Sequence, residues 1–315
     1  MAVNINYIIG IDGGGTKTEC VLSDSKFNII DTSFGEASNF LVFGIDKVNK
    51  RLYELINRCL KKNKLKFENL SAIIIGTAGA GRIKDAENLR SSFIKFLKSK
   101  KINFKNFYVF SDARIALEGA FSGKPGSILI AGTGSIMFGK DKVGKIHRVG
   151  GFGRLIGDEG SGYSLGRKGL NAVSKELDGR GKKTEITKLI RKKYKIQSAD
   201  DLIISVYREK LDIASVVPLV LKAAGKKDAI ASKIINEETG ELIFHIKAMY
   251  EKLNQKILEV SFIGGIVENK NTFSDLLRKK INKELPKIIV TKPQKQPAFG
   301  ALLLAGERIR NLHNA

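Results

Sequence analysis

Apolar and polar positions in the first 120 residues follow two alternating periods. Residues 70–77 (LSAIIIGT) form a continuous apolar run of strand length, which is typical of a strand covered on both faces. Between residues 47 and 62 the apolar positions recur every three or four residues, which predicts a helix with one buried face. By the same criteria we expect strands at 7–12, 19–23, 27–34 and 106–110, and helices at 86–98 and 113–121. Strands that alternate with helices on a covered sheet indicate an α/β fold.

The pattern restarts near residue 126. The segment GSILIAGTGSIM (126–137) repeats the layout of the first strand, glycine turn and second strand. A glycine-rich stretch at 150–169 follows, and then helical spacing continues to about residue 259. The remaining elements that we expect are strands at 260–263 and 287–291, a helix capped near Thr272 between them, and a last helix opened by Pro297.

At 315 residues the chain is long enough for two lobes, each with its own core. We expect an N-terminal lobe at 1–118 and a C-terminal lobe at 119–296 with a helical insertion at about 169–259. The C-terminal helix, 297–315, is expected to pack back on the first lobe. No proline-rich linker separates the lobes, so they should hinge at packed elements.

The composition narrows the function classes. The net charge of +23 and the pI of about 9.9 can accompany nucleic-acid or membrane binding. The lysines and arginines are spread along the whole chain, however, with no helix-turn-helix, RNA-recognition or zinc-finger pattern, so we expect no specific nucleic-acid partner. There is no apolar run of about 18 residues, which predicts no membrane span, and no signal-peptide pattern. Cys20 and Cys59 form neither a disulfide framework nor a metal motif, so a cytoplasmic protein is expected.

The segment IIGIDGGGTKTECVLSD (8–24) carries the strongest functional signal. Glycines serve where a backbone adopts a positive φ or approaches a ligand closely, and successive backbone N–H groups in such a turn bind anions. Asp12 precedes Gly13, Gly14 and Gly15, and Thr16-Lys17-Thr18 follows. An acid beside a phosphate site favours a divalent cation, so one interpretation is a Mg–nucleotide site; a tight hairpin turn is the other. The turn matches neither the Walker A nor the dinucleotide pattern.

Two further glycine turns follow strands. Gly132-Thr133-Gly134-Ser135 supplies small residues and two hydroxyl groups, and together with the first turn it favours a phosphate site. Gly264-Gly265 ends the expected strand at 260–263, and the missing side chains there would let a flat base approach the backbone; a plain strand-to-helix turn is the alternative.

Candidate acids stand at two places. Asp112 follows a strand and precedes a helix, so it could be a base at the carboxyl end of a parallel strand or, like Ser111, a helix N-cap. The run Gly150 to Gly162 contains many glycines, and ordering them on folding costs much backbone entropy. Such a cost is expected where a loop must wrap closely around a ligand. Asp158 and Glu159 in that run could bind sugar hydroxyls or a hydrated metal, or could begin a helix.

Five segments in the same order resemble the N-acetylglucosamine kinase and BadF/BadG/BcrA/BcrD ATPase family of the actin-like ATPase superfamily. They are IDGGGTKTE, SDARIALEGA, AGTGS, GGFGRLIGDEGSGY and FIGG, and the resemblance runs from about residue 8 to residue 306. It implies two ribonuclease-H-like lobes with a central cleft for ATP and a sugar, and an enzyme that acts as an ATP-dependent sugar kinase. A homodimer is expected, since dimers are common in the family.

The resemblance also implies roles for individual residues. Asp112 matches the catalytic base, and Asp12 matches the acid near Mg²⁺, to which it would bind through water. The positions that it implies for ATP are Gly14, Gly15, Thr16, Lys17, Thr133, Gly134, Ala214, Gly264 and Gly265. Those that it implies for the sugar are Asn39, Asp112, Gly151, Phe152, Gly153 and Asp158.

The expected reaction is transfer of the γ-phosphoryl group of ATP to the primary hydroxyl of an amino sugar or hexose, with N-acetylglucosamine or glucosamine as the first candidates. Phe152 departs from the family pattern, because the N-acetylglucosamine kinases have tryptophan there and this chain has none. The alternative is a BadF-type ATPase or a sugar-responsive regulator that phosphorylates no sugar. Cys20 and Cys59 do not lie in the context of an iron–sulfur activator.

Overall fold

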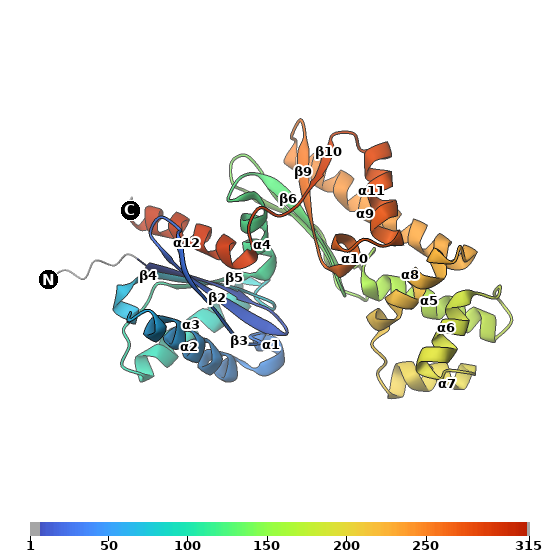
Figure 1. Cartoon of the computed structure of the whole chain (residues 1–315), viewed down its shortest axis with the longest axis horizontal. Coiled ribbons are helices and arrows are strands. Elements are labelled where there is room, and N and C mark those ends of the chain that lie inside the picture. Colours follow the sequence, from blue (N-terminus) through green and yellow to red (C-terminus); the bar gives the residue numbers. More distant parts are fainter. Residues whose placement is uncertain (1–6, 314–315) are drawn as a thin grey trace. The chain divides into compact units, whose positions relative to one another are not determined.

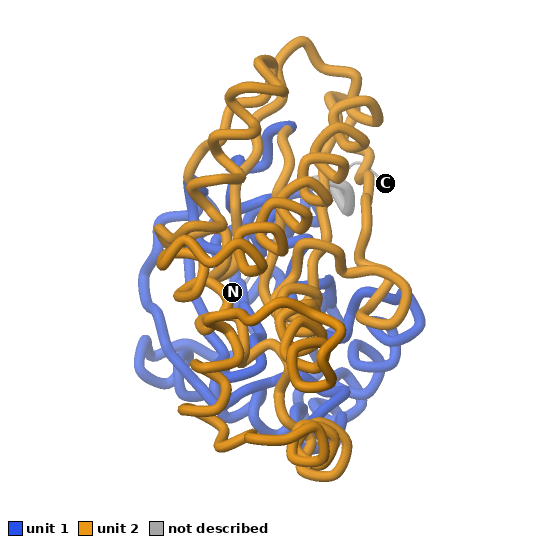
Figure 2. The backbone as a smooth tube through the Cα atoms, turned by 90° about the vertical axis from the view of Figure 1, so that its right-hand side faces the viewer, with its two compact units in different colours: residues 1–125, 293–315 blue, residues 126–292 orange. Residues whose placement is uncertain are grey.

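The computed structural model describes residues 7–313, with side chains up to residue 309. It divides into two compact units, and Figure 2 shows their residues: unit 1 runs to Pro125 and resumes at Pro293, and unit 2 is Gly126–Lys292. The expected lobe boundary at 118/119 lies inside a helix that ends at Phe121, so the division comes a few residues later. Residues 1–6 and 314–315, which were assigned to the first lobe, lie outside the described residues.

Unit 1 is built on a five-stranded sheet in the order β3-β2-β1-β4-β5. The strand β1 pairs antiparallel with β2 and parallel with β4, and β4 pairs parallel with β5. Its strands are β1 (Tyr7–Gly13), β2 (Lys17–Asp24), β3 (Ile29–Glu36), β4 (Leu70–Thr77) and β5 (Phe107–Ser111). Its helices are α1 (Phe40–Phe43), α2 (Ile45–Lys62), the 3₁₀ turn Phe67–Asn69, α3 (Ile83–Ser99), α4 (Asp112–Phe121) and α12 (Pro297–His313).

Helices cover both faces of this sheet. Successive residues of a strand point to opposite faces, so neighbouring residues of β1 pack against different helices. Ile9 and Ile11 of β1 pack in one cluster with apolar residues of α2 and α3, whereas Ile8 packs in another with residues of α4 and α12. Figure 1 shows α2 and α3 on one side of the sheet and α12 with α4 on the other. The continuous apolar run of β4 is therefore a strand buried on both faces, as predicted.

Unit 2 repeats the same sheet topology, in the order β8-β7-β6-β9-β10. The strands β6, β7 and β8 are antiparallel neighbours, and β6 pairs parallel with β9 and β9 with β10. Its strands are β6 (Gly126–Ala131), β7 (Ser135–Lys140), β8 (Ile146–Gly150), β9 (Leu258–Ile263) and β10 (Ile288–Thr291). The predicted restart of the pattern is thus confirmed, as are the α/β class and the two sheets; β8 was not predicted.

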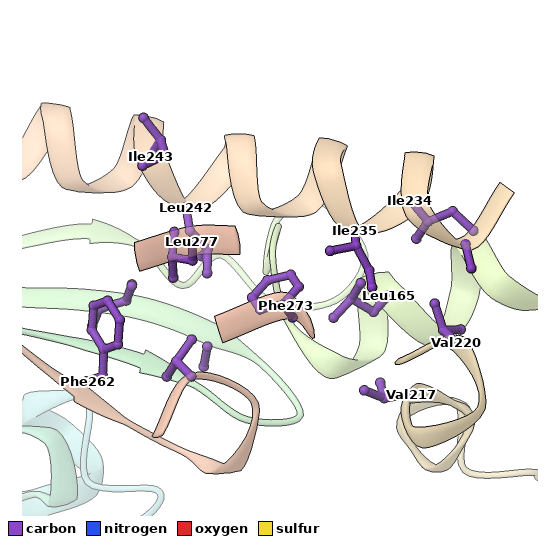
Figure 3. Close-up of a cluster of buried hydrophobic side chains, with 14 of the residues drawn as sticks. Leu165, Val217, Val220, Ile234, Ile235, Leu242, Ile243, Phe262, Phe273 and Leu277 are labelled. Atoms are coloured by element: carbon purple, nitrogen blue, oxygen red, sulfur yellow. The ribbon is translucent and has the colours of Figure 1, made fainter. Parts of the chain in front are cut away.

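The helices of unit 2 share a large apolar cluster with its sheet. They are α5 (Gly162–Leu177), α6 (Glu185–Tyr194), α7 (Ala199–Ile203), a π-helical turn Ile204–Arg208, a 3₁₀ turn Ile213–Val216, α8 (Val217–Gly225), α9 (Ala229–Leu253), α10 (Gly265–Glu268) and α11 (Thr272–Glu284). Figure 3 shows Ile235 and Leu242 of α9 pointing toward Leu165, Phe273 and Leu277.

Two expectations about unit 2 were wrong in detail. The helical region begins at Gly162 rather than near residue 169, so α5 includes the last part of the glycine-rich stretch. The helix α11 is capped by Asn271, whose side chain accepts hydrogen bonds from the Phe273 and Ser274 amides, and not by Thr272.

Candidate functional site

Three parallel strands of unit 1 end side by side at one edge of the sheet. In the register of the sheet, Gly13 at the end of β1 lies opposite Thr77 of β4, and Thr77 lies opposite Ser111 of β5. Asp12 and Asp112, which adjoin Gly13 and Ser111, are therefore brought to the same edge. The carboxyl edge of parallel strands is the usual place for a ligand in α/β folds.

The helix cap at the start of α4 is Ser111 and not Asp112. The Ser111 side chain accepts a hydrogen bond from the Arg114 amide at 3.2 Å. Asp112 is the first residue of the helix, its side chain is exposed, and its Oδ1 lies 2.8 Å from the Ala113 amide nitrogen. Since Ser111 fills the structural role, the Asp112 carboxylate is available for chemistry.

Asp12 has an unusual carboxyl group. Its pKa is raised to about 6, first by burial and then by the negative charges of Asp112 and Glu19, against which Lys17 acts weakly. The contribution of Asp112 shows that the two carboxylates lie within electrostatic reach of each other. The negative charge of Asp112 thus disfavours ionisation of Asp12, and a cation beside Asp12 would offset this effect.

The surroundings of the three glycines in the first turn differ. None of them has a positive φ, so the left-handed conformation is not the reason for glycine here. A Cβ on Gly13 would lie 2.6 Å from Ser38 Oγ, and one on Gly14 would lie 3.0 Å from the Lys17 carbonyl oxygen. A Cβ on Gly15 would meet no atom within 4 Å. Neither packing nor conformation of the chain requires glycine at position 15, and the space beside it is open.

The rest of this turn faces outward. Thr16 and Lys17 are exposed, and the Gly14 amide donates to the Lys17 carbonyl at 3.1 Å, which closes the turn. The Lys17 ammonium lies 5.1 Å from the centre of the Phe34 ring. Both side chains could therefore reach a bound anion without breaking internal hydrogen bonds.

Asn39 is tied to the same turn by residues that sequence reasoning missed. The Ser38 amide donates to the Gly14 carbonyl at 3.3 Å, and buried Ser38 Oγ accepts a hydrogen bond from Thr18 Oγ1 at 2.8 Å. Thr77 Oγ1 donates to the Ser38 carbonyl at 3.2 Å. Asn39 itself caps α1, with Oδ1 accepting from the Leu41 amide at 3.1 Å, so its Nδ2 group remains to donate to a ligand. We call Asp12, residues 13–17, Asn39 and Asp112 the unit 1 site.

The second glycine turn connects β6 and β7 in unit 2 and supports the start of α5. The Gly162 amide donates to the Gly132 carbonyl at 2.8 Å, and the Tyr163 amide donates to the Thr133 carbonyl at 3.0 Å. The Thr133 side chain is exposed. As at Gly15, a Cβ on Gly132 would meet no atom within 4 Å.

The other residues proposed for ATP lie around this turn. A Cβ on Gly264, whose φ is +106°, would lie 2.4 Å from the Ala131 carbonyl oxygen, so Gly264 touches the end of β6. A Cβ on Gly162 would lie 3.6 Å from Ala214 Cβ. Gly265 is exposed, and a Cβ there would meet only Asn269 Nδ2, at 3.4 Å. Unit 2 thus gathers the glycine turn, Ala214 and the Gly264-Gly265 pair.

The loop from residue 150 to residue 160 lies beside the same turn. Asp158 has a φ of +59°, and its Oδ1 accepts a hydrogen bond from the Gly153 amide at 3.3 Å. A Cβ on Gly134 would lie 2.9 Å from Asp158 Oδ2, so the carboxylate stands between the loop and the glycine turn. Because Ser161 caps α5 and no acid lies in its first turn, Asp158 and Glu159 do not serve as a helix start.

The apex of this loop is exposed. Gly151 and Gly153 have φ values of +73° and +86°, so both need glycine for conformational reasons. The Phe152 ring is 69% exposed and lies 5.6 Å from the Arg148 guanidinium. An exposed aromatic ring is suited to contact with a sugar or a base. We call Thr133, Gly134, residues 151–158, Ala214, Gly264 and Gly265 the unit 2 site.

A cavity of about 670 Å³ opens at the unit 2 site. Its lining includes Thr133, Gly134, Asp158, Tyr163, Asp212 and Ile213. This volume is in the range of nucleotide and drug-sized ligands. Sequence reasoning missed Tyr163 and Asp212, since neither lies in a glycine turn. Asp212 caps the 3₁₀ turn that carries Ala214, by accepting from the Ala214 amide at 3.1 Å.

Within residues 7–313, no group of three or more His, Cys, Asp and Glu side chains is placed to hold a metal ion. In the same part of the chain, no helix has both the length and the apolar character needed to cross a membrane.

Comparison with known proteins shows the family of the chain. The model of the BadF/BadG/BcrA/BcrD ATPase family matches residues 9–305. The chain is 38% identical to an N-acetylmuramic acid/N-acetylglucosamine kinase of Clostridium acetobutylicum over 96% of this chain and 98% of that protein. It is 33% identical to the N-acetyl-D-glucosamine kinase of Dictyostelium discoideum over 94% of this chain and 97% of that one.

Solved structures show the same fold. A candidate N-acetylglucosamine kinase from Chromobacterium violaceum superposes with a TM-score of 0.72 at 25% identity, covering 96% of this chain and 99% of that one. A ROK family glucokinase from Streptomyces griseus, solved with glucose and AMPPNP, has a TM-score of 0.55 at 15% identity, covering 97% and 99%. The family match spans nearly the whole chain, and the chain therefore belongs to the BadF/BadG/BcrA/BcrD ATPase family.

Proposed function

We propose that this chain is an ATP-dependent kinase that transfers the γ-phosphoryl group to the primary hydroxyl of an amino sugar, and that the unit 1 and unit 2 sites serve that one reaction. Membership of the family implies use of ATP. The two relatives of 33% and 38% identity are both kinases of N-acetylated amino sugars. N-acetylglucosamine is therefore the first substrate to test, with glucosamine and N-acetylmuramic acid next.

The observation that carries this proposal is the carboxyl edge of the unit 1 sheet. It combines an exposed carboxylate that is not needed as a helix cap, a half-buried acid with a pKa of about 6, and a turn whose Gly15 leaves open space. A general base, a cation ligand and a phosphate-binding turn are the parts that phosphoryl transfer needs, since that reaction depends on positioning and charge balance.

In the proposed reaction Asp112 accepts the proton of the sugar's primary hydroxyl. The hydroxyl oxygen forms a bond to the γ-phosphorus while the bond between that phosphorus and the β,γ-bridging oxygen breaks, which leaves ADP and a sugar phosphate. Asn39 Nδ2 would donate to a sugar hydroxyl, and the Asp158 carboxylate would accept from another. The Gly151–Gly153 backbone and the Phe152 ring would contact the sugar face.

The residues present fit a triphosphate and its cation. Gly15 and Gly132 leave space where a backbone can approach phosphate oxygens, and Thr16 and Thr133 are exposed beside them. Gly134, Ala214, Gly264 and Gly265 would contact the remainder of the nucleotide. Mg²⁺, when bound, would balance the phosphate charge; it usually takes few protein ligands and keeps several waters, so Asp12 alone could hold it through water.

A coupled ADP-release assay with product mass spectrometry tests this function. The panel is N-acetylglucosamine, glucosamine, glucose, N-acetylmannosamine and N-acetylmuramic acid. We expect ADP release that depends on an amino sugar, together with a product heavier by one phosphate group. Steady ADP release without any phosphorylated sugar across the panel would instead favour an ATPase or a regulator.

The raised pKa of Asp12 predicts a pH dependence of nucleotide binding. The group is half protonated near pH 6 in the free protein, and only the carboxylate can hold a hydrated cation. Below pH 6 the ionised fraction falls about tenfold per pH unit, so the affinity for MgADP should fall by up to the same factor, and it should level off above pH 7. Calorimetric titration with MgADP between pH 5 and 8 measures this.

The variant Asp12→Asn is the control for protonation of the nucleotide itself. Any pH dependence of the affinity that remains in this variant comes from the nucleotide. In the variant Asp112→Asn the affinity for MgADP should begin to fall at a lower pH than in the wild type, since the variant removes a charge that raises the pKa of Asp12. Identical profiles for the wild type and Asp12→Asn would contradict this role of Asp12.

A further inference from the structure

Both ends of the 150–160 loop rest on the helix α9. Gly150 and Gly160 have φ values of +68° and +75°. A Cβ on Gly150 would lie 2.3 Å from His245 Nε2, and one on Gly160 would lie 2.4 Å from Leu242 Cδ2. Leu242 lies in the middle of α9 and points into the core of unit 2 (Figure 3). The loop is thus attached to the most extensive part of that core.

One polar contact joins α9 to the loop. Glu238 is buried, with a side chain that is 2% exposed, and its Oε2 accepts a hydrogen bond from the Gly160 amide at 2.7 Å. Its Oε1 lies 2.8 Å from the Lys168 ammonium on α5. A buried carboxylate is costly unless it is paired and hydrogen-bonded, so these partners are what make Glu238 tolerable at this position.

The hydrogen bond between Glu238 and Gly160 lies close to Asp158, the residue that we expect to bind the sugar. Gly160 lies two positions after Asp158, and the Glu159 carbonyl between them accepts a hydrogen bond from Ser135 Oγ at 2.6 Å. Asp158 has a left-handed φ of +59°, which is unfavourable for a residue other than glycine and persists only when neighbouring groups enforce it. Ser135 from one side and Glu238 from the other fix the backbone that follows Asp158.

We propose that Glu238, with its charge balanced by Lys168, is a positioning residue for sugar binding. By holding the Gly160 amide it keeps the Asp158 carboxylate between the Gly153 amide and the Gly132–Gly134 turn. This inference rests on the proposed function, because it assumes that Asp158 contacts the sugar. No part of Glu238 needs to touch the sugar or ATP.

The chain contains a matched control for Glu238. Glu237 lies next to it on α9 and contacts the same Lys168 ammonium at 2.8 Å, but its side chain is 42% exposed. Replacing Glu237 by glutamine removes the same charge near Lys168 and leaves the Glu238–Gly160 hydrogen bond in place. In Glu238→Gln one acceptor oxygen must serve two donors, and the side-chain NH2 group faces either the Gly160 amide or the Lys168 ammonium, so the contact with the loop is disrupted. The pair Glu238→Gln and Glu237→Gln therefore separates this disruption from the loss of charge alone.

The test compares kcat and both KM values for the two variants and the wild type. Glu238→Gln should raise the KM for the amino sugar by about 10–100-fold, the range for a lost hydrogen bond to a charged group, while the KM for ATP changes less than about threefold. Glu237→Gln should change neither value by more than about threefold. Equal effects of the two variants, or a Glu238→Gln enzyme with the wild-type sugar KM, would overturn the proposal.

Hydrogen exchange of the free protein gives a second readout that does not depend on activity. Peptides that contain residues 157–161 should exchange faster in Glu238→Gln than in Glu237→Gln. If this difference appears but no sugar is phosphorylated, the positioning contact stands and the proposed function fails. If exchange is unchanged, the positioning contact fails whatever the activity.

Should Glu238→Gln fail to fold, Lys168→Gln takes its place in both measurements. The Lys168 side chain is 32% exposed, and the amide group of a glutamine can still donate a hydrogen bond to the Glu238 carboxylate, so this replacement leaves that buried group with a donor. It leaves the Glu238 carboxylate without its cation and should raise the sugar KM by about 3–10-fold, as expected for a partly exposed pair. An unchanged sugar KM together with unchanged exchange at 157–161 would then overturn the proposal.

Discussion

Replacement of Asp112 by asparagine is expected to lower kcat by about 10²–10⁴-fold, the range for loss of a general base. Asparagine has nearly the same shape as aspartate but cannot accept the proton of the attacking hydroxyl. Asn39 and the 151–158 loop are untouched, so the sugar should still bind with an affinity within about tenfold of the wild type. Rapid kinetics with N-acetylglucosamine and calorimetric sugar binding measure the two quantities.

Two control variants separate the base from other roles of this helix end. Ser111→Ala removes the hydrogen bond to the Arg114 amide and should cost about 0.5–2 kcal/mol of stability with kcat retained within about tenfold. Asp85 stands in the first turn of α3, as Asp112 does in α4, so Asp85→Asn should leave kcat unchanged. Near-wild-type turnover of Asp112→Asn would remove Asp112 from the role of base.

The second large effect is expected for Gly300→Ala, at the contact between α12 and α4. A Cβ on Gly300 would lie 1.9 Å from the Ile115 carbonyl oxygen and 2.5 Å from the Gly119 amide nitrogen. Both are backbone atoms of α4, so no side-chain rotation can relieve the clash. A Cβ on Gly119 would in turn lie 2.7 Å from the Gln296 carbonyl oxygen. The two helices cross backbone to backbone, and Figure 1 shows α12 beside α4.

We expect Gly300→Ala to destabilise the protein by about 1–3 kcal/mol despite the better helix propensity of alanine. Because α4 begins with Asp112, a shift of this helix should also lower kcat. The matched control is Gly240→Ala in the middle of α9, where the nearest atom to a new Cβ is Lys280 Nζ at 3.7 Å; it should stabilise by about 0.5–1 kcal/mol. Urea unfolding of both variants measures the difference, and equal stability of Gly300→Ala and wild type would contradict the close crossing.

Much of the fold could be predicted from apolar runs and glycine turns. The strand β4 begins and ends where the run LSAIIIGT does, and the second strand–turn–strand layout marks the second sheet. The strand β8 was missed because it is an edge strand of the sequence IHRVG in which no residue is fully buried. Its apolar contrast is therefore weak.

The start of α5 could not be predicted for a different reason. Gly162, Gly166 and Gly169 disfavour a helix by propensity, yet each faces a close neighbour. A Cβ on Gly166 would lie 2.0 Å from the Ile213 carbonyl oxygen, for example. Tertiary packing requires glycine inside this helix, and the sequence alone cannot distinguish such glycines from those of a loop.

Prediction of the candidate site was limited in a similar way. The residues of the glycine turns and the acids beside them stand out locally, as Asp12, Thr133 and Asp158 do. The groups that hold them are polar residues whose partners are distant in sequence. Ser38 meets Thr18 and Thr77, and Glu238 meets Gly160 across 78 positions. A single sequence gives no sign of such pairs, because each member alone is an ordinary serine, threonine or glutamate.

The most direct test of the central claim is the structure of the product. The enzyme is incubated with ATP, Mg²⁺ and N-acetylglucosamine, and the sugar product is examined by phosphorus–proton correlation NMR while ADP is quantified. We predict one sugar phosphate for each ADP, with the phosphorus coupled to the protons of the primary alcohol carbon. ADP without sugar phosphate, or a phosphate on the anomeric or a secondary hydroxyl, would contradict the account.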